Sequence, residues 1–134
     1  MDDWEVLDEE TVDSLPCEAG LYIILSVHGG RPRVIRRVLG NDTSGILCIG
    51  RAGTRGLKNR LSIFLRAACD GRAPHSEGKT YCRCRYDEEG YPLDSLEFSW
   101  WPLRPRDAKQ WERDGLQAYE NVFGELPPLN KRCG

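Results

Sequence analysis

The chain has 134 residues, of which 40% are hydrophobic and 30% are charged. This length and composition suit one compact domain with one core, and they exclude a disordered chain. No apolar stretch approaches the roughly 20 residues that a membrane-spanning helix needs, and the acidic N-terminus lacks the pattern of a signal peptide. We therefore expect a single domain over residues 1–134, in the cytoplasm and without a membrane partner.

The net charge of −2 is unevenly distributed. Residues 1–20 contain eight acids and no Lys or Arg, which leaves 19 bases and 13 acids in the rest of the chain. Residues 31–66 contain nine bases and one acid, Asp42. So basic a segment is typical of a phosphate-binding surface. The alternative is a solvated basic face that the acidic N-terminal segment, residues 1–19, balances.

The first half of the chain predicts a short helix at 11–15 and then three strands. A strand at 21–27 is followed by a turn at 28–30 and a second strand at 33–39. A further turn leads to a short buried strand at 45–49, which completes an antiparallel meander. A helix is predicted over 55–69, because its apolar residues share one face. Those residues are Leu57, Leu61, Phe64, Leu65 and Ala68.

The second half begins with a long irregular segment at 70–93, which is rich in Gly, Pro and charge. A strand at 96–103 follows. Asp107 resembles an N-cap with Gln110 three positions later, and predicts a helix that ends at Phe123 before Gly124. The expected fold is a small α/β (α+β) sandwich, in which helices flank a mostly antiparallel sheet of three or four strands.

Glu112 is the most informative single residue of the predicted C-terminal helix. Leu116, Tyr119 and Phe123 follow it by 4, 7 and 11 positions, so that the carboxylate is in line with the apolar stripe. Burying a carboxylate is costly unless it is paired or bound to a metal. A divalent cation is one partner for Glu112, and an Arg or the helix dipole is the alternative.

Several other residues are less specific when taken alone. Arg60 flanks the apolar face of its helix, where it fits either a structural ion pair or a phosphate. The six cysteines, in a chain without a secretion signal, are expected to be reduced. Cys82 and Cys84 would share one side of a strand, which leaves a thiol-based metal or redox protein as a minor alternative.

Together, the residues from Gly20 to Asn130 resemble the GIY-YIG nuclease superfamily. The first tripeptide is Gly20-Leu21-Tyr22, and the second is Cys48-Ile49-Gly50 followed by Arg51. Arg60 takes the place of the family's helical arginine, Glu112 that of its metal-binding glutamate, and Asn130 that of its closing asparagine. The segment from His75 to Tyr81 is similar to a loop that small standalone members have after the first helix.

The resemblance implies a GIY-YIG-like fold and an endonuclease that hydrolyses DNA with Mg²⁺ or Mn²⁺ held by Glu112. The implied catalytic residues are Tyr22, Cys48, Arg60, Glu112 and Asn130. The implied DNA contacts are Arg51, Arg55, Lys58, Arg66 and His75, with residues 31–37 in addition. Such contacts supply affinity without sequence information. A targeting partner protein or a homodimer is a further expectation, because the chain has no separate DNA-reading domain.

The chain departs from the family at two positions. Cys48 replaces the second tyrosine, and Phe64 stands where tyrosine or histidine is common. Both favour an alternative in which the domain binds DNA without cutting it. Trp100 and Trp101, together with the acidic N-terminal segment, favour a second alternative, a protein-interaction module.

Overall fold

The computed structural model describes residues 4–131, and its centre is an antiparallel sheet. Strand β2 (Gly20–His28) is the middle strand, with β6 (Ile46–Ala52) on one side and β7 (Leu96–Pro102) on the other. The short strands β1 (Glu5–Val6) and β3 (Arg31–Pro32) extend the sheet from β7 and from the end of β2. The predicted α+β class and the mostly antiparallel sheet are confirmed.

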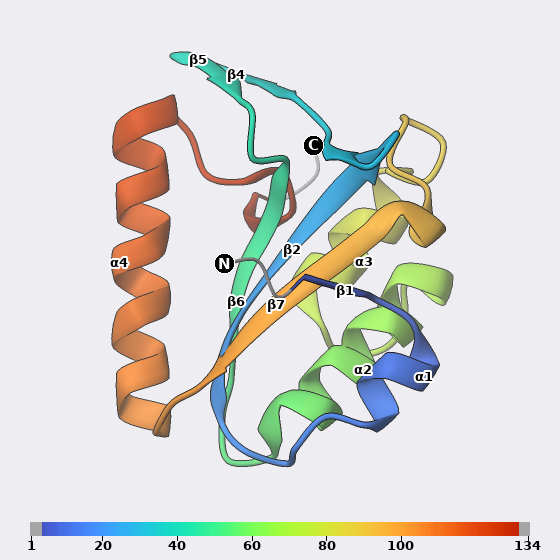
Figure 1. Ribbon diagram of the computed structural model, residues 1–134, viewed down its shortest axis with the longest axis vertical. Coiled ribbons are helices and arrows are strands. Elements are labelled where there is room, and N and C mark those ends of the chain that lie inside the picture. Colours follow the sequence, from blue (N-terminus) through green and yellow to red (C-terminus); the bar gives the residue numbers. More distant parts are fainter. Residues whose placement is uncertain (1–3, 132–134) are drawn as a thin grey trace.

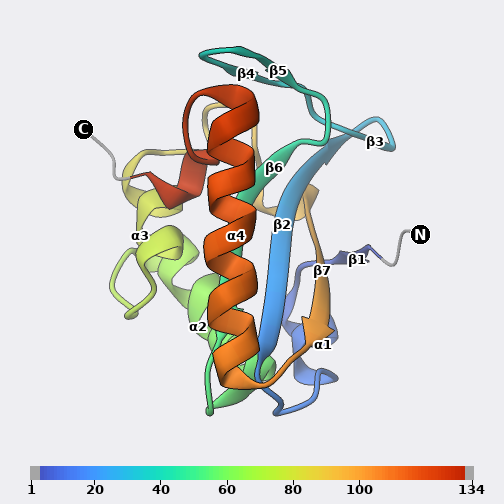
Figure 2. The same cartoon turned by 90° about the vertical axis from the view of Figure 1, so that its left-hand side faces the viewer.

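Helices cover both faces of this sheet (Figure 2). One face packs against α1 (Glu9–Asp13), α2 (Gly56–Asp70) and α3 (Ser76–Arg83), and contains most of the buried apolar side chains. Helix α4 (Pro105–Phe123) covers the other face with a smaller cluster, in which Tyr119 packs on Leu21 and Ile49. The edge of β6 therefore lies between α4 and the α2–α3 pair.

Strand alternation decides which residues of β2 and β6 face each helix layer. Tyr22 pairs with Gly50, and both face α2, whereas Leu21 pairs with Arg51 on the α4 side. This register places the two tripeptides side by side. It also directs Arg51 toward the helix that carries Glu112.

The segment between β2 and β6 is not the simple meander that the sequence predicted. The expected strand at 33–39 is reduced to β4 (Ile35–Arg37), which pairs with β5 (Gly40–Asp42) in a separate two-stranded hairpin. The hairpin is anchored to the end of α4, because the backbone N–H of Leu39 donates to the Phe123 carbonyl at 2.9 Å. Figure 1 shows it beyond the end of the sheet.

The region expected to be irregular contains helix α3, so that prediction was wrong. Cys82 is in this helix and Cys84 is its C-cap, and neither lies on a strand. Cys84 is disulfide-bonded, which contradicts the expectation that all six cysteines are reduced. Cys17, Cys48, Cys69 and Cys82 are free, whereas Cys133 is outside the described residues.

Of the three predicted helices, the one at 55–69 is confirmed as α2 to within one residue at each end, whereas the other two differ more at their N-terminal ends. Helix α1 begins two residues earlier than expected, with the Asp8 side chain as its cap at 2.9 Å from the Thr11 nitrogen. Helix α4 begins at Pro105 without a side-chain cap, so the predicted capping box at Asp107 was wrong. Its predicted end is confirmed, because Gly124 adopts the left-handed conformation (φ 81°) after Phe123.

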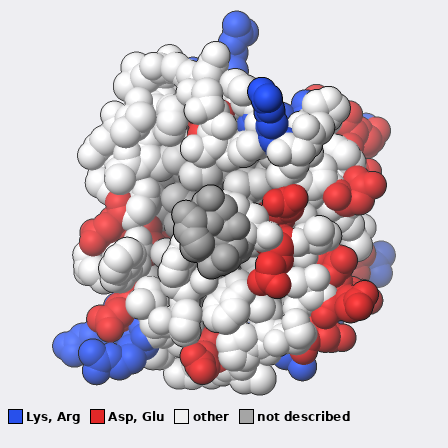
Figure 3. All heavy atoms as spheres, in the orientation of Figure 1, with Lys and Arg blue, Asp and Glu red and all other residues white. Residues whose placement is uncertain are grey.

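The acidic N-terminal segment, as far as it is described, is part of the fold. It provides β1 and α1, and the indole nitrogen of Trp100 donates to Glu5 Oε2 at 3.2 Å. Figure 3, in the orientation of Figure 1, shows acidic side chains gathered on the side of the molecule where α1 lies. Among residues 4–131, no helix is long and apolar enough to cross a membrane.

Candidate active site

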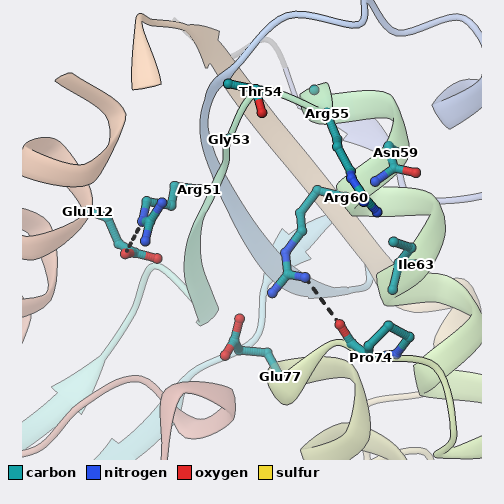
Figure 4. A pocket seen from close by; sticks show the side chains of 11 residues that line it. Arg51, Gly53, Thr54, Arg55, Asn59, Arg60, Ile63, Pro74, Glu77 and Glu112 are labelled. Atoms are coloured by element: carbon teal, nitrogen blue, oxygen red, sulfur yellow. Dashed lines mark hydrogen bonds and ion pairs between the residues drawn. The ribbon is translucent and has the colours of Figure 1, made fainter. Parts of the chain in front are cut away.

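A polar hollow of about 560 Å³ opens between the end of β6, the start of α2, the start of α3 and the first half of α4. Its charged residues come from all four elements, or from the turn between β6 and α2. They are Arg51, Arg55, Arg60, Glu77 and Glu112. Figure 4 shows the side chains of Arg60 and Glu77 directed toward each other. The fold thus brings together charges from positions up to 61 residues apart in the sequence.

Glu112 and Arg51 form the ion pair on the α4 side of the hollow. Arg51 Nε donates to Glu112 Oε1 at 3.1 Å, and the Glu112 side chain retains 26% of its exposure. Burial raises the pKa of Glu112, and the charges of Arg51 and Arg60 offset part of that effect. The predicted position of Glu112 beside the apolar stripe is confirmed, with Tyr119 buried two turns further along.

Arg60 lies near the centre of the hollow, on the exposed edge of α2. Its Nη1 donates to the Pro74 carbonyl at 3.2 Å, which holds the side chain against the segment before α3 (Figure 4). A guanidinium has five N–H donors. Arg60 therefore keeps donors for a ligand while one N–H fixes its position.

Tyr22 lies behind the hollow and is fully buried, as is His75. The Tyr22 hydroxyl is 2.9 Å from His75 Nε2, and His75 Nδ1 is 3.2 Å from the backbone nitrogen of Gly78, which can only donate. Burial and the charge of Arg60 lower the pKa of His75 to about 3. The neutral ring therefore carries its proton on Nε2 and donates it to Tyr22.

The glycine of the second tripeptide is required by this arrangement. A Cβ at Gly50 would be 2.4 Å from Tyr22 Cζ and 2.5 Å from the Tyr22 hydroxyl oxygen. The tyrosine ring therefore lies directly over the backbone of β6. This close approach gives a physical reason for pairing a tyrosine on β2 with a glycine on β6.

The two positions at which the sequence departs from the GIY-YIG pattern are both in the core. Cys48 and Phe64 have no exposed surface, and Phe64 packs edge-on against the His75 ring with the centroids 5.2 Å apart. Burial raises the pKa of the Cys48 thiol well above its usual value, so the thiol is not ionised near neutral pH. Neither side chain lines the hollow.

Asn130 binds the outer edge of β6 with both ends of its side-chain amide. Its Oδ1 accepts from the Ile49 nitrogen at 3.0 Å, and its Nδ2 donates to the Ile49 carbonyl at 2.9 Å. Asn130 ends the short 3₁₀ turn η2 (Pro128–Asn130), which packs along β6. The structure places Asn130 next to the second tripeptide, and not among the residues that line the hollow.

The structure does not bring all of the expected DNA contacts together at the hollow. Arg51 and Arg55 line the hollow, whereas Lys58 does not. Arg66 lies on another surface, where it borders a groove beside the N-terminal segment. His75 has no exposed surface, so it cannot contact DNA in this conformation.

Sequence reasoning missed Glu77, Asn59 and Thr54, which also line the hollow. Glu77 is in the first turn of α3 and its side chain is 19% exposed. Asn59 immediately precedes Arg60, and that proximity was the one sequence signal for it. Glu77 was missed because residues 70–93 were expected to be irregular. No helix was predicted there, so no helix face indicated this carboxylate.

A divalent cation is compatible with these side chains. Mg²⁺ in proteins is usually held by one or two carboxylates together with water and substrate phosphates. Within residues 4–131 there is no group of three or more His, Cys, Asp or Glu that could hold a metal. The half-buried Glu112, whose burial disfavours its charged form, provides one oxygen ligand of the required type.

Comparison with known proteins gave no match: no family model, no curated protein and no solved structure is significantly similar to this chain.

Proposed function

We propose that this protein is a divalent-metal-dependent DNA endonuclease. The observation that carries the proposal is the polar hollow, in which three arginines face two half-buried glutamates beside the Tyr22–His75 pair. Phosphodiester hydrolysis needs cations around the phosphate and a carboxylate to hold a metal. The arginines and carboxylates of the hollow support this assignment, and Arg51, Arg60 and Glu112 are at positions that resemble those of the GIY-YIG nucleases. DNA is the proposed partner, and the cytoplasm the proposed location.

In this proposal the arginines bind the scissile phosphate and the phosphates next to it. Arg60 is fixed by the Pro74 carbonyl, and its remaining donors stabilise the charge that develops on the phosphoryl oxygens. Arg51 and Arg55 lie on the same hollow and contact the neighbouring phosphates of the strand. Because these contacts are to the backbone, binding is expected to be salt-dependent and nearly independent of sequence.

Glu112 would hold Mg²⁺ or Mn²⁺, which when bound polarises the phosphate and stabilises the leaving 3′ oxygen. Arg51 keeps the Glu112 carboxylate oriented toward the hollow through its 3.1 Å contact. Tyr22 and Asn130 are positioning residues in this proposal. Tyr22 supports the β6 backbone at Gly50, and Asn130 supports it at Ile49.

The test is nicking of supercoiled plasmid with Mg²⁺ or Mn²⁺ by wild type and Glu112→Gln. Glutamine can still accept from Arg51 but provides no negative charge, so we expect at least a roughly 100-fold loss of nicking with DNA binding retained. Glu120→Gln, an exposed site on the same helix, is the matched control and should cut like wild type. Nicking by Glu112→Gln at the wild-type rate would exclude this site.

A DNA-binding relative that does not cut is the second candidate, and the burial of Cys48 and Phe64 favours it. Neither side chain offers a polar group to the hollow. In that case Arg60→Ala should weaken salt-sensitive DNA binding, while no variant or metal produces nicking.

A protein-interaction module is the third candidate. Trp101 is 42% and Trp111 59% exposed, and both border an apolar hollow of about 680 Å³ on the α4 side of the sheet. A module of this kind should show no salt-dependent DNA binding.

A further inference from the structure

Hydrolysis at this site needs a group that accepts a proton from the attacking water. Tyr22 is badly placed for that role, because it is fully buried and its hydroxyl oxygen accepts from His75. Burial also raises the pKa of Tyr22 well above its ordinary value. The Cys48 thiol is equally buried and lies away from the hollow.

His75 is also unsuitable as the base. Its Nε2 carries the proton that binds Tyr22, and its Nδ1 already accepts from Gly78. Glu112 has one oxygen bonded to Arg51 and is assigned to the metal. The proton acceptor must therefore be another group with access to the hollow.

Glu77 meets this requirement. It enters the hollow from α3, with Arg60 facing it and with Glu112 on a different wall (Figure 4). Among the described residues, its side-chain ion-pair contact is with His75 Nδ1 at 3.8 Å. Because that nitrogen carries no proton, the carboxylate remains available.

The surroundings of Glu77 also suit a base. Burial raises its pKa, the charge of Arg60 opposes that rise, and the charge of Glu112 adds to it. A carboxylate that is less acidic than usual accepts a proton more readily. The other charged groups on the walls of the hollow are the cationic side chains of Arg51 and Arg55.

We propose that Glu77 is the general base of the reaction. This role rests on the endonuclease function proposed above. The Glu77 carboxylate takes a proton as the water O–H bond breaks, and the water oxygen forms a bond to phosphorus. The bond from phosphorus to the 3′ oxygen then breaks, and solvent water protonates the leaving oxygen. Water is the one co-reactant, and no group is oxidised or reduced.

The experiment measures single-turnover cleavage of a radiolabelled DNA duplex at saturating protein, with Mg²⁺, across pH 5.5–8.5. Glu77→Gln should lower the cleavage rate by about 10²–10⁴-fold, while its Kd for DNA and its Tm stay near the wild-type values. Glu77→Asp should restore part of the rate, because it retains a carboxylate. Glu88→Gln, on the exposed turn after α3, is the matched control.

The pH profile separates catalysis from a structural role. The wild-type rate should rise with pH through the ionisation of the base, and Glu77→Gln should lose that limb. If the Gln variant does not fold, Glu77→Ser, which also removes the carboxylate from the first turn of α3, takes its place. Wild-type cleavage rates in a folded variant would overturn the role of Glu77 alone, whereas a wild-type protein that never cuts DNA would overturn the proposed function itself.

Discussion

Replacing Tyr22 by phenylalanine tests the buried hydrogen bond between Tyr22 on β2 and His75 at the start of α3. The substitution removes the hydroxyl that accepts from His75 Nε2 at 2.9 Å and keeps the ring in place. Neither residue has exposed surface, so water cannot replace the lost acceptor. Moving the His75 proton to Nδ1 does not help, because the Gly78 N–H would then lose its acceptor.

The expected magnitude follows from that geometry. An orphaned buried donor costs roughly 1–3 kcal/mol. At this chain length, each kcal/mol changes Tm by roughly 4 °C. We therefore expect Tyr22→Phe to lower Tm by about 4–12 °C, with the apolar packing of the ring almost unchanged.

The assay is thermal unfolding followed by circular dichroism, with urea unfolding for the free energy. Tyr91→Phe is the matched control: Tyr91 is partly exposed, so water can solvate its surroundings and the expected change is within about 0.5 kcal/mol. Imidazole ¹⁵N shifts should also show the His75 proton on Nε2. Equal Tm values for the two variants, or a proton on Nδ1, would refute the assigned hydrogen-bond direction.

Two further predictions concern the same buried group. The pKa of His75 is about 3 when folded against 6.5 when free, so the unfolded chain binds more protons between these values and stability falls as pH falls. From pH 7 to 5, the free energy of unfolding of the wild type should fall by about 2 kcal/mol more than that of His75→Asn. The asparagine can still cap the Gly78 N–H. Equal changes in the two free energies, measured by urea unfolding, would contradict this. Gly50→Ala should cost roughly 1–3 kcal/mol, because its Cβ would be 2.4 Å from the Tyr22 ring. Gly53→Ala, with nothing within 4 Å, is the control, and equal urea midpoints would show that the ring moves freely.

A local sequence pattern made five elements predictable: the strands β2, β6 and β7 and the helices α2 and α4. Strand alternation and the 3.6-residue helical period can each be recognised from a few neighbouring residues. Helix α3 has little such pattern, since its buried residues are Gly78 and Tyr81. Gly78 is buried because α3 approaches α2 so closely that a Cβ would be 2.7 Å from Ala67 Cβ. That contact is set by tertiary packing, which local periodicity does not record.

The same distinction applies to the candidate site. Glu112 was identified because a carboxylate beside an apolar stripe is unusual in any sequence. Glu77 faces Arg60 because of how α3 docks on α2, which the sequence did not show. The role of Asn130 could not be predicted from its own position either, since its partners are the backbone groups of Ile49, 81 residues away.

The amide of Asn130 has a consequence for how copies of this protein behave at high concentration. Strand β6 pairs with β2 on one side only, and an exposed strand edge is a template on which another chain can add. By occupying the N–H and C=O of Ile49, Asn130 blocks that template at its centre. The C-terminal turn thus protects the molecule from edge-to-edge aggregation, in addition to any part it has in positioning the second tripeptide.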